Sequence, residues 1–397
     1  MNIIFNKDRQ KVPIKSWCGN PEAGALEQAL NVSNHPKIFG HVALMPDLHP
    51  GYGMPIGGVS ALKEAISPNM VGVDIACGMM AEKFDFKADA FSREDKINIM
   101  REIRDLIPMG MRHQRDHSVF KKEAKDLLEK HRNSLRNLKR GDELATFDAV
   151  AEQLGTLGGG NHFIEMQSDD DGFLWFMLHS GSRNIGKCVC DRFNKIAKEL
   201  NGRHKIILPA PDLAFLPIDS DEGQEYLSLL KFCIDFSFLN RECMFKKIAE
   251  SLKRVIGSTP AILQKINIHH NYASLEEHFG EKVWVHRKGA TFASLGNIGI
   301  IPGSMGTSSY IVKGRGSEDS FRSCSHGAGR VMGRHQATKT FTMDKFRESM
   351  EGIVFHCSER HLDESPMAYK DIDTVMEEQK DLVEIVHRLK PMAVEKG

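Results

Sequence analysis

The chain has 397 residues, of which 41 % are hydrophobic and 27 % are charged, a composition typical of a globular protein that buries its own core. Its 53 basic side chains balance 53 acidic ones, which excludes a basic coat over the whole surface but not a local basic groove for nucleic acid. A core of this size needs no structural metal, so we expect any bound metal to serve chemistry.

The N-terminus and the cysteines predict a cytoplasmic protein. The first residues, MNIIFNKDRQK, lack the apolar core of a signal peptide, and no apolar run approaches the roughly 18 residues that a membrane span requires. Eight cysteines occur without a CxxC pair, which argues against a zinc finger and against a disulfide framework. We therefore expect a reducing, cytoplasmic environment and no membrane association.

Three segments have the pattern of helices. Ser92 and Asp95 form a capping pair ahead of an apolar-periodic run, which predicts a helix to about Leu106. Apolar side chains at helical spacing predict one or two helices over residues 222–256 and another over residues 372–389.

Short apolar runs between these helices predict buried strands. The runs are Val71–Ile75, Phe173–Leu178, Ile266–Ile268 and Ile298–Ile301. Helices and strands do not alternate regularly, so the pattern favours an α+β fold over a doubly wound sheet. We expect a single large domain over residues 1–397, with central sheets flanked by helices and helical excursions at about 92–140 and 222–256.

The stretch from Lys121 to Arg140 is the candidate for a local basic surface. It holds eight basic side chains, three acidic ones and leucines near helical spacing. The same pattern is typical of a solvated amphipathic helix, and this interpretation competes with a nucleic-acid groove.

The first candidate site segments are Met45–Gly58, Val71–Gly78 and Leu154–Glu165. In the first, Asp47 and His49 fit turn stabilisation as well as function. In the second, the Asp74 carboxylate within an apolar run is costly to bury unless it is paired or binds a metal. Its neighbour Cys77 is either an inert core thiol or a metal ligand. In the third, three glycines before His162 form either a simple turn or a close approach to a ligand.

The remaining candidate segments are Phe173–Arg183, Ile266–Asn271, Ile300–Ser309 and Cys324–Arg330. In the first, His179 is followed by hydroxyls, a glycine and an arginine suited to phosphate, and the absence of GxSxG rejects a serine hydrolase. Adjacent His269 and His270 on a strand point to opposite faces, so only one can face a given site. The last two segments resemble anion-binding loops, in which His326 fits a ligand, a base or a nucleophile.

Six side chains in these segments share one setting, because each follows a strand-like run and lies in a glycine-rich turn. They are Asp74, Cys77, His162, His179, His270 and His326. The shared setting predicts one metal-centred site collected from distant segments, with phosphate-binding loops around it. The residues alone thus indicate metal-dependent phosphoryl or nucleotidyl chemistry.

Eight ordered motifs resemble the RtcB family of RNA ligases over nearly the whole chain, from Met45 to Lys396–Gly397. They are MPDLHPGYG, VGVDIACG, GGGNHFIE, LHSGSR, HHN, IPGSMG, CSHGAGR and PMAYKDID. The resemblance implies an RtcB-like fold and an enzyme that uses GTP and Mn²⁺. Such an enzyme joins RNA 3′-phosphate or 2′,3′-cyclic phosphate ends to 5′-hydroxyl ends, in RNA splicing or repair. Some members of the family also use an activating protein partner.

The resemblance also implies roles for individual residues. His326 would attack GTP and carry the guanylate, and Cys77 would bridge two Mn²⁺ ions. One ion would add Asp74 and His162, and the other His179 and His270. The guanylate pocket would comprise Asn161, His162, Phe163, Ile164, Glu165, His270, Asn271, Pro302, Gly303, Ser304, Met305, Ser309, His326, Gly327, Ala328, Gly329 and Lys396.

Two arginines, Arg183 and Arg330, are candidates for phosphate or RNA contacts. Asn184, Gly159 and Arg322 depart from the family's pattern, and none of them is a predicted metal ligand or the nucleophile.

Two alternatives compete with a ligase. A metal-dependent phosphatase or nuclease acting on RNA ends would use the same ligands with a site-held water and no covalent nucleotide. A non-catalytic RNA-binding module fits less well, because the net charge is zero and only 8 % of the residues are aromatic.

Overall fold

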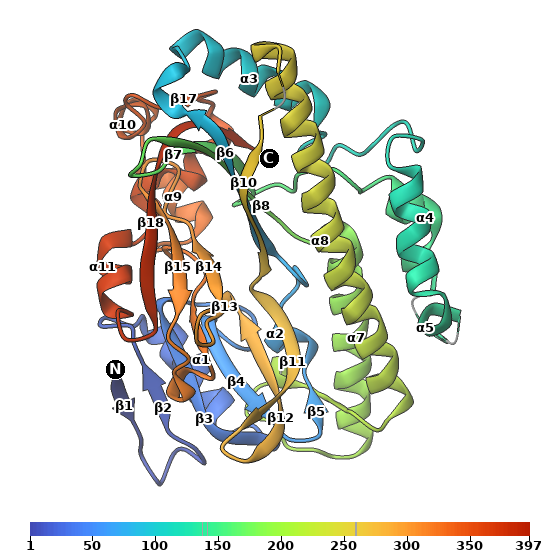
Figure 1. The fold of residues 1–397 in the computed structure, drawn as a ribbon. Helices are drawn as coiled ribbons and strands as arrows, with labels where there is room; N and C mark the ends of the chain where they lie inside the picture. Colours follow the sequence, from blue (N-terminus) through green and yellow to red (C-terminus); the bar gives the residue numbers. More distant parts are fainter. Residues whose placement is uncertain (137, 141, 259) are drawn as a thin grey trace.

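The computed structural model describes residues 1–136, 138–140, 142–258 and 260–397. Figure 1 shows two large sheets, with the long helices α7 (Arg183–Arg203) and α8 (Asp221–Ile256) running along one side. Most strand pairs are antiparallel, and helices and strands do not alternate in a regular βαβ series in the described residues. The predicted α+β class is therefore confirmed.

The larger sheet has eight strands within the described residues. In spatial order they are β10 (Ile262–His269), β6 (Gly78–Lys87), β8 (Phe173–Ser180), β7 (Phe163–Ser168), β18 (Val383–Lys396), β15 (Ser309–Gly314) and β14 (Ile298–Ile301), with β17 (Val354–Phe355) paired to β18. The second sheet is ordered β1 (Asn2–Ile4), β2 (Ile14–Ser16), β3 (Ile38–His49), β4 (Ile56–Leu62), β12 (Glu281–Lys288) and β11 (Asn271–His278). Two small sheets pair β13 (Ala290–Phe292) with β16 (Ser323–Ser325) and β5 (Ala65–Ile66) with β9 (Leu216–Pro217).

The remaining α-helices are short or lie at the edges of the sheets. They are α1 (Ala23–Ser33), α2 (Pro68–Val71), α3 (Arg93–Leu106), α4 (Lys121–Lys130), α5 (Arg132–Arg136), α6 (Phe147–Ala151), α9 (Arg334–Thr340), α10 (Met343–Ser349) and α11 (Ile372–Glu378). In the part of the chain that the structure describes, no helix has the length and apolarity needed to cross a bilayer.

Local capping signals define the helices that the sequence predicted. Helix α3 begins after Ser92, whose hydroxyl accepts from the Asp95 amide while the Asp95 carboxylate accepts from the Ser92 amide. Helix α8 begins after Ser220, which caps the amide of Gly223, and ends at Gly257 in the left-handed region with φ +75°. The predicted helix over residues 222–256 is thus one continuous helix.

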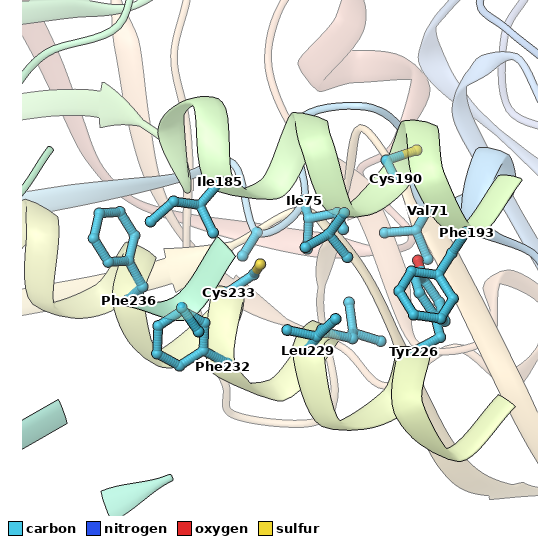
Figure 2. Packing of buried hydrophobic residues seen from close by; sticks show 14 of the residues in the cluster. Val71, Ile75, Ile185, Cys190, Phe193, Tyr226, Leu229, Phe232, Cys233 and Phe236 are labelled. Carbon is cyan, nitrogen blue, oxygen red and sulfur yellow. The ribbon is translucent and has the colours of Figure 1, made fainter. Parts of the chain in front are cut away.

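The strand predicted at Val71–Ile75 is wrong. Helix α2 ends at Val71, and the chain then turns through Gly72, whose φ is +105°. The run is apolar because it packs into the core between α7 and α8, as Figure 2 shows for Val71 and Ile75 beside Phe193 and Leu229. Burial of Val71 and Ile75 makes a turn as apolar as a strand would be, although Val73 between them is exposed.

The helix predicted over residues 372–389 is wrong in its second half. Helix α11 ends at Glu378, and Val383 begins the strand β18, which pairs with both β15 and β7. Cross-strand hydrogen bonds to β15 over Val383–Leu389 outweigh a weak local helix preference here. The predicted strands at 173–178, 266–268 and 298–301 lie within β8, β10 and β14 and are confirmed.

The basic stretch from Lys121 to Arg140 contains helices α4 and α5 and projects to one side of the molecule (Figure 1). Asn137, within this predicted excursion, lies outside the described residues. Ion pairs occupy most of the basic side chains of the stretch, for example Lys130 with Asp235 at 2.8 Å and Arg140 with Glu225 at 3.1 Å. This pattern favours the solvated amphipathic interpretation over the groove.

Candidate functional site

Strand pairing in the larger sheet gathers the predicted metal ligands at one end. Cys77 immediately precedes β6, whose first residue Gly78 pairs with both Ser180 and His269. His179 of β8 pairs with Phe163, the first residue of β7. The chain crosses from the larger sheet to the second sheet between β10 and β11, and His270 lies at that crossing.

The expectation that every ligand follows a strand is only partly correct. Asp74 and Cys77 follow helix α2, and His162 lies in the turn before β7. Antiparallel neighbours bring the beginning of one strand beside the end of the next, so both kinds of position reach the same edge. His269, as predicted, points away and packs against Phe238 and Tyr272.

Two overlapping groups of potential metal ligands share the thiol of Cys77. Its Sγ lies 3.0 Å from His179 Nε2 and 3.3 Å from His162 Nε2. His162 Nε2 also lies 3.1 Å from Asp74 Oδ2, and His179 Nε2 lies 3.2 Å from His270 Nε2. One group is therefore Asp74, Cys77 and His162, and the other is Cys77, His179 and His270.

The protonation of these groups fits cation binding. Burial, followed by the charges of neighbouring histidines, holds the pKa values of His179 and His270 well below the ordinary range, so both rings are neutral. His179 Nδ1 lies 3.3 Å from the Asn161 carbonyl and donates to it, which leaves the Nε2 lone pair facing the thiol. The Nε2 atoms of His179 and His270 lie 3.2 Å apart, and two lone pairs at this distance repel each other unless a proton or a cation lies between them.

The carboxylate and the thiol complete the donor set. Burial opposes ionisation of Asp74, but its hydrogen bond and ion pair with His162 hold its pKa below the ordinary value. Burial and the charge of Asp74 raise the pKa of the Cys77 thiol well above its ordinary value, and a bound cation would reverse that effect. A mixture of oxygen, nitrogen and sulfur ligands fits Mn²⁺, although it binds Zn²⁺ more tightly.

His326 is held by a buried carboxylate that the sequence did not single out as functional. Asp47 on β3 is fully buried, and its Oδ2 accepts from the His326 Nδ1 at 2.6 Å and from the His326 amide at 3.1 Å. Burial would raise the pKa of Asp47, but the charge and hydrogen bond of His326 hold it below the ordinary value. With Nδ1 donating, Nε2 is the nitrogen available for chemistry.

The ring of His326 lies beside the metal-ligand groups and keeps some exposure to solvent. Its centroid is 4.7 Å from that of His270, and its side chain is 15 % exposed. Gly329 makes this placement possible, because at its φ of +74° a Cβ would lie 2.2 Å from the Asp47 carbonyl oxygen. Position 181 needs a glycine for a similar reason, because a Cβ at Gly181 would lie 2.2 Å from Asp74 Oδ1.

A cavity of about 640 Å³ opens in front of His326, large enough for a nucleotide. Twelve predicted pocket residues line it: Asn161, Phe163, Glu165, Pro302, Gly303, Ser304, Met305, His326, Gly327, Ala328, Gly329 and Lys396. The predicted metal ligand His179 and the predicted phosphate contact Arg330 line it as well. Burial raises the pKa of the lining residue Glu165 to about 8.

Five predicted pocket residues do not line the cavity, and two of them, His162 and His270, belong to the metal-ligand groups. Ile164 is fully buried in the hydrophobic core. The Asn271 side chain binds backbone, donating to the Asp74 carbonyl at 3.0 Å and accepting from the Gly289 amide at 2.7 Å. The Ser309 hydroxyl accepts from Gln167 at 3.2 Å behind the cavity wall. These positions support the site without lining the cavity.

The two predicted phosphate-contact arginines differ in placement. Arg330 lines the cavity, whereas Arg183 donates to the Thr156 hydroxyl at 2.9 Å and to the Gly110 carbonyl at 2.7 Å. The guanidinium of Arg183 therefore holds the loop that precedes His162.

Glu364 organises the cationic wall of the cavity, and no sequence signal distinguished it. Its carboxylate accepts from Tyr369 at 2.6 Å, from Lys396 at 2.9 Å and from Arg330 at 3.1 Å, and it also pairs with Arg334. Burial would raise the pKa of Glu364, but the charges of Lys396 and Arg334 lower it to about 2. One carboxylate thus fixes three cations at the edge of the cavity.

Comparison with known proteins places this site in context. Residues 28–397 match the family model described as tRNA-splicing ligase RtcB. The chain is 38 % identical to the RNA-splicing ligase RtcB of Escherichia coli strain K12, over 98 % of both chains. It is 32 % identical to the tRNA-splicing ligase RtcB of Thermococcus kodakarensis, over 94 % of this chain and 91 % of the relative. It is also 31 % identical to the RNA-splicing ligase RtcB of Mycobacterium bovis, over 93 % of this chain and all of the relative.

Proposed function

Because the chain belongs to the RtcB family of RNA-splicing ligases, we propose that it joins RNA ends through a guanylate carried on His326. Family membership makes it an RNA ligase and favours this function over the phosphatase or nuclease considered above. The observation that supports the covalent step best is the Asp47–His326 hydrogen bond, which leaves the His326 Nε2 available beside the Cys77 ligand groups.

The reaction begins with a nucleophilic attack. The His326 Nε2 lone pair attacks the α-phosphorus of GTP, a P–N bond forms, and the bond to the β-phosphate breaks to release pyrophosphate. The imidazole becomes positively charged as it attacks, and the buried Asp47 carboxylate compensates that charge. Asp47 thus orients the ring and stabilises its charged form.

Two transfers complete the joining of the RNA ends. An oxygen of the RNA 3′-phosphate attacks the guanylate phosphorus, and the P–N bond breaks to restore neutral His326. The 5′-hydroxyl oxygen of the second strand then attacks the RNA phosphorus, GMP leaves, and the hydroxyl proton is lost to solvent or a base. A 2′,3′-cyclic phosphate enters this sequence after water opens it to a 3′-phosphate.

The residues that would hold Mn²⁺ are the two groups that share Cys77. Asp74 and His162 would complete one ion's protein ligands, and His179 and His270 the other's. When bound, two adjacent cations neutralise phosphate charge and so lower the barrier to attack. Around them, the backbone amides of Met305 and Gly327–Gly329, together with Lys396, would supply donors for the nucleotide.

Labelled GTP tests the proposal directly. Incubation of the full chain with Mn²⁺ and α-phosphate-labelled GTP is expected to yield a protein adduct that is stable to base and labile to acid. The same incubation with γ-labelled GTP should leave the protein unlabelled, because the label departs with pyrophosphate. A chase with RNA bearing a 3′-phosphate and a 5′-hydroxyl should discharge the adduct and release GMP. Ligation of these ends without any protein-bound label would overturn the covalent mechanism.

Replacing Asp47 by asparagine tests the orienting carboxylate. We expect Asp47→Asn to slow guanylylation by about 10²- to 10⁴-fold, because a neutral amide cannot compensate the imidazolium charge and can favour the wrong tautomer. Single-turnover labelling with α-labelled GTP measures the rate. Metal content should stay unchanged, because Asp47 belongs to neither ligand group. An unaltered labelling rate would mean that Asp47 has a structural role only and does not assist guanylylation.

A further inference from the structure

A second cavity adjoins the one that contains His326. It has a volume of about 490 Å³ and is lined by Arg104, Met109, Gly110, Met111, Arg112, Arg360, Glu395, Lys396 and Gly397. Lys396 lines both cavities, so the second lies directly beside the first. We call this second cavity the Arg112 groove.

The Arg112 groove carries an excess of positive charge. Arg104 and Glu395 compensate each other through a two-pronged ion pair with distances of 2.9 and 2.6 Å. Arg112 and Arg360 are exposed and form no ion pair with any residue that the structure describes, and Arg360 donates only to the ring of its neighbour His361. Two uncompensated guanidinium groups therefore face solvent beside the cavity of His326.

A third cavity extends the Arg112 groove outward. This third cavity shares Arg104, Met111 and Arg112 with the groove and adds the basic side chain of Arg115, with Asp105 and Asp116 as its acidic lining residues. The Met111 side chain is 90 % exposed, which leaves an apolar surface between the cations. Cations that follow one another along a groove, with apolar surface between them, suit a single nucleic-acid strand, whose phosphates and bases alternate.

The basic stretch from Lys121 to Arg140 is not adjacent to the cavity of His326 in this way. The cavity lined by Lys125 and Arg136 shares no lining residue with the cavity of His326. A phosphate bound there could not belong to the nucleotide next to the reacting end. Position relative to His326, and not the number of cations, distinguishes the two surfaces.

We propose that the Arg112 groove binds the backbone phosphates of the RNA strand whose 3′-phosphate is activated at His326, an assignment that rests on the proposed function. The strand with the 3′-phosphate brings an additional negative charge into the cavity itself. Uncompensated cations in a groove directly beside the cavity match backbone phosphates that precede that terminal one. The 5′-hydroxyl strand has no terminal phosphate, so its end does not require a cationic groove next to the cavity.

A charge-matched pair of double variants tests this assignment. Arg112→Ala/Arg360→Ala removes two groove cations, and Lys125→Ala/Arg136→Ala removes two exposed cations from the separate cavity. For the groove variant we expect the KM of a ten-nucleotide 3′-phosphate strand to rise roughly five- to tenfold, and the slope of log KM against log salt to fall by about 1.4. The KM of a dinucleotide 3′-phosphate should change little, because it is too short to reach the groove.

Guanylylation by GTP alone separates the possible failures. The groove variant should become labelled at the wild-type rate and with the wild-type KM for GTP, which also shows that it is folded. A raised KM for GTP would assign the groove to the triphosphate and overturn the proposal. An effect on the 5′-hydroxyl strand alone, or an equal effect of the Lys125→Ala/Arg136→Ala control, would overturn it as well. If the wild type takes up no guanylate, the proposed function fails first, and the groove assignment fails with it.

Discussion

His326→Ala is expected to abolish labelling of the chain by α-labelled GTP and to lower ligation by at least about 10³-fold. No other lining residue of the cavity offers an imidazole held in the same way, because His179 lies among the metal-ligand candidates and His49 hydrogen-bonds the Asp47 carbonyl at 3.0 Å. The measurement is radioactivity retained on the denatured protein after incubation with Mn²⁺ and GTP.

His387→Ala is the matched control for this prediction. His387 lies on β18, outside the cavity, and packs against Trp175. Its replacement should leave labelling unchanged, so a loss in His326→Ala alone would locate the adduct. RNA already activated as a 3′-guanylate provides a further check, because it bypasses the first step and should restore part of the ligation in His326→Ala. Persistent labelling of His326→Ala would place the guanylate on another side chain.

Cys77→Ala should have an effect of similar size through the metal. The Cys77 Sγ lies within 3.3 Å of His162 and His179, which belong to different ligand groups, so its loss removes a ligand from both. We expect metal affinity to fall by at least about 10- to 100-fold and guanylylation to be abolished. Metal per chain, measured by elemental analysis after dialysis against Mn²⁺, checks the first part independently of activity.

Cys233→Ala is the control for removal of a buried thiol. Cys233 is fully buried in the core between α7 and α8 (Figure 2) and is not part of either ligand group. Its replacement should cost some stability through the cavity it leaves, with metal content and labelling retained. If Cys77→Ala keeps the full wild-type metal content, the shared-ligand assignment is wrong.

Much of the secondary structure was predictable because its causes are local. The Ser92–Asp95 capping box and the apolar run Phe173–Leu178 lie within a few residues of the structure they determine. Errors occurred where partners distant in the sequence decide the outcome. Val71 and Ile75 are apolar because they pack into the core between α7 and α8, and residues 383–389 form a strand because they pair with β15.

The site residues likewise include some that the sequence predicted and some that only the structure identified. Histidines, a cysteine and an aspartate in glycine-rich segments predicted a metal-centred site, and the structure brings the six named side chains together. Asp47 and Glu364 were not selected, because a carboxylate in a turn or a short helix is common without a function. Their importance lies in their partners, and Asp47 is 279 positions from His326 in the sequence.

The sequence by itself determined the α+β class, the family and the chemical types of the side chains in the site, since composition, periodicity and ordered motifs are properties of the chain. Only the tertiary structure decided which nitrogen of His326 is available, which carboxylate holds its ring and which cations lie uncompensated beside the cavity. Each of these depends on distances of a few ångströms between segments that strand pairing brings together. Hydrogen-bond and charge energies fall off over such distances, so spacing along the chain carries no information about them.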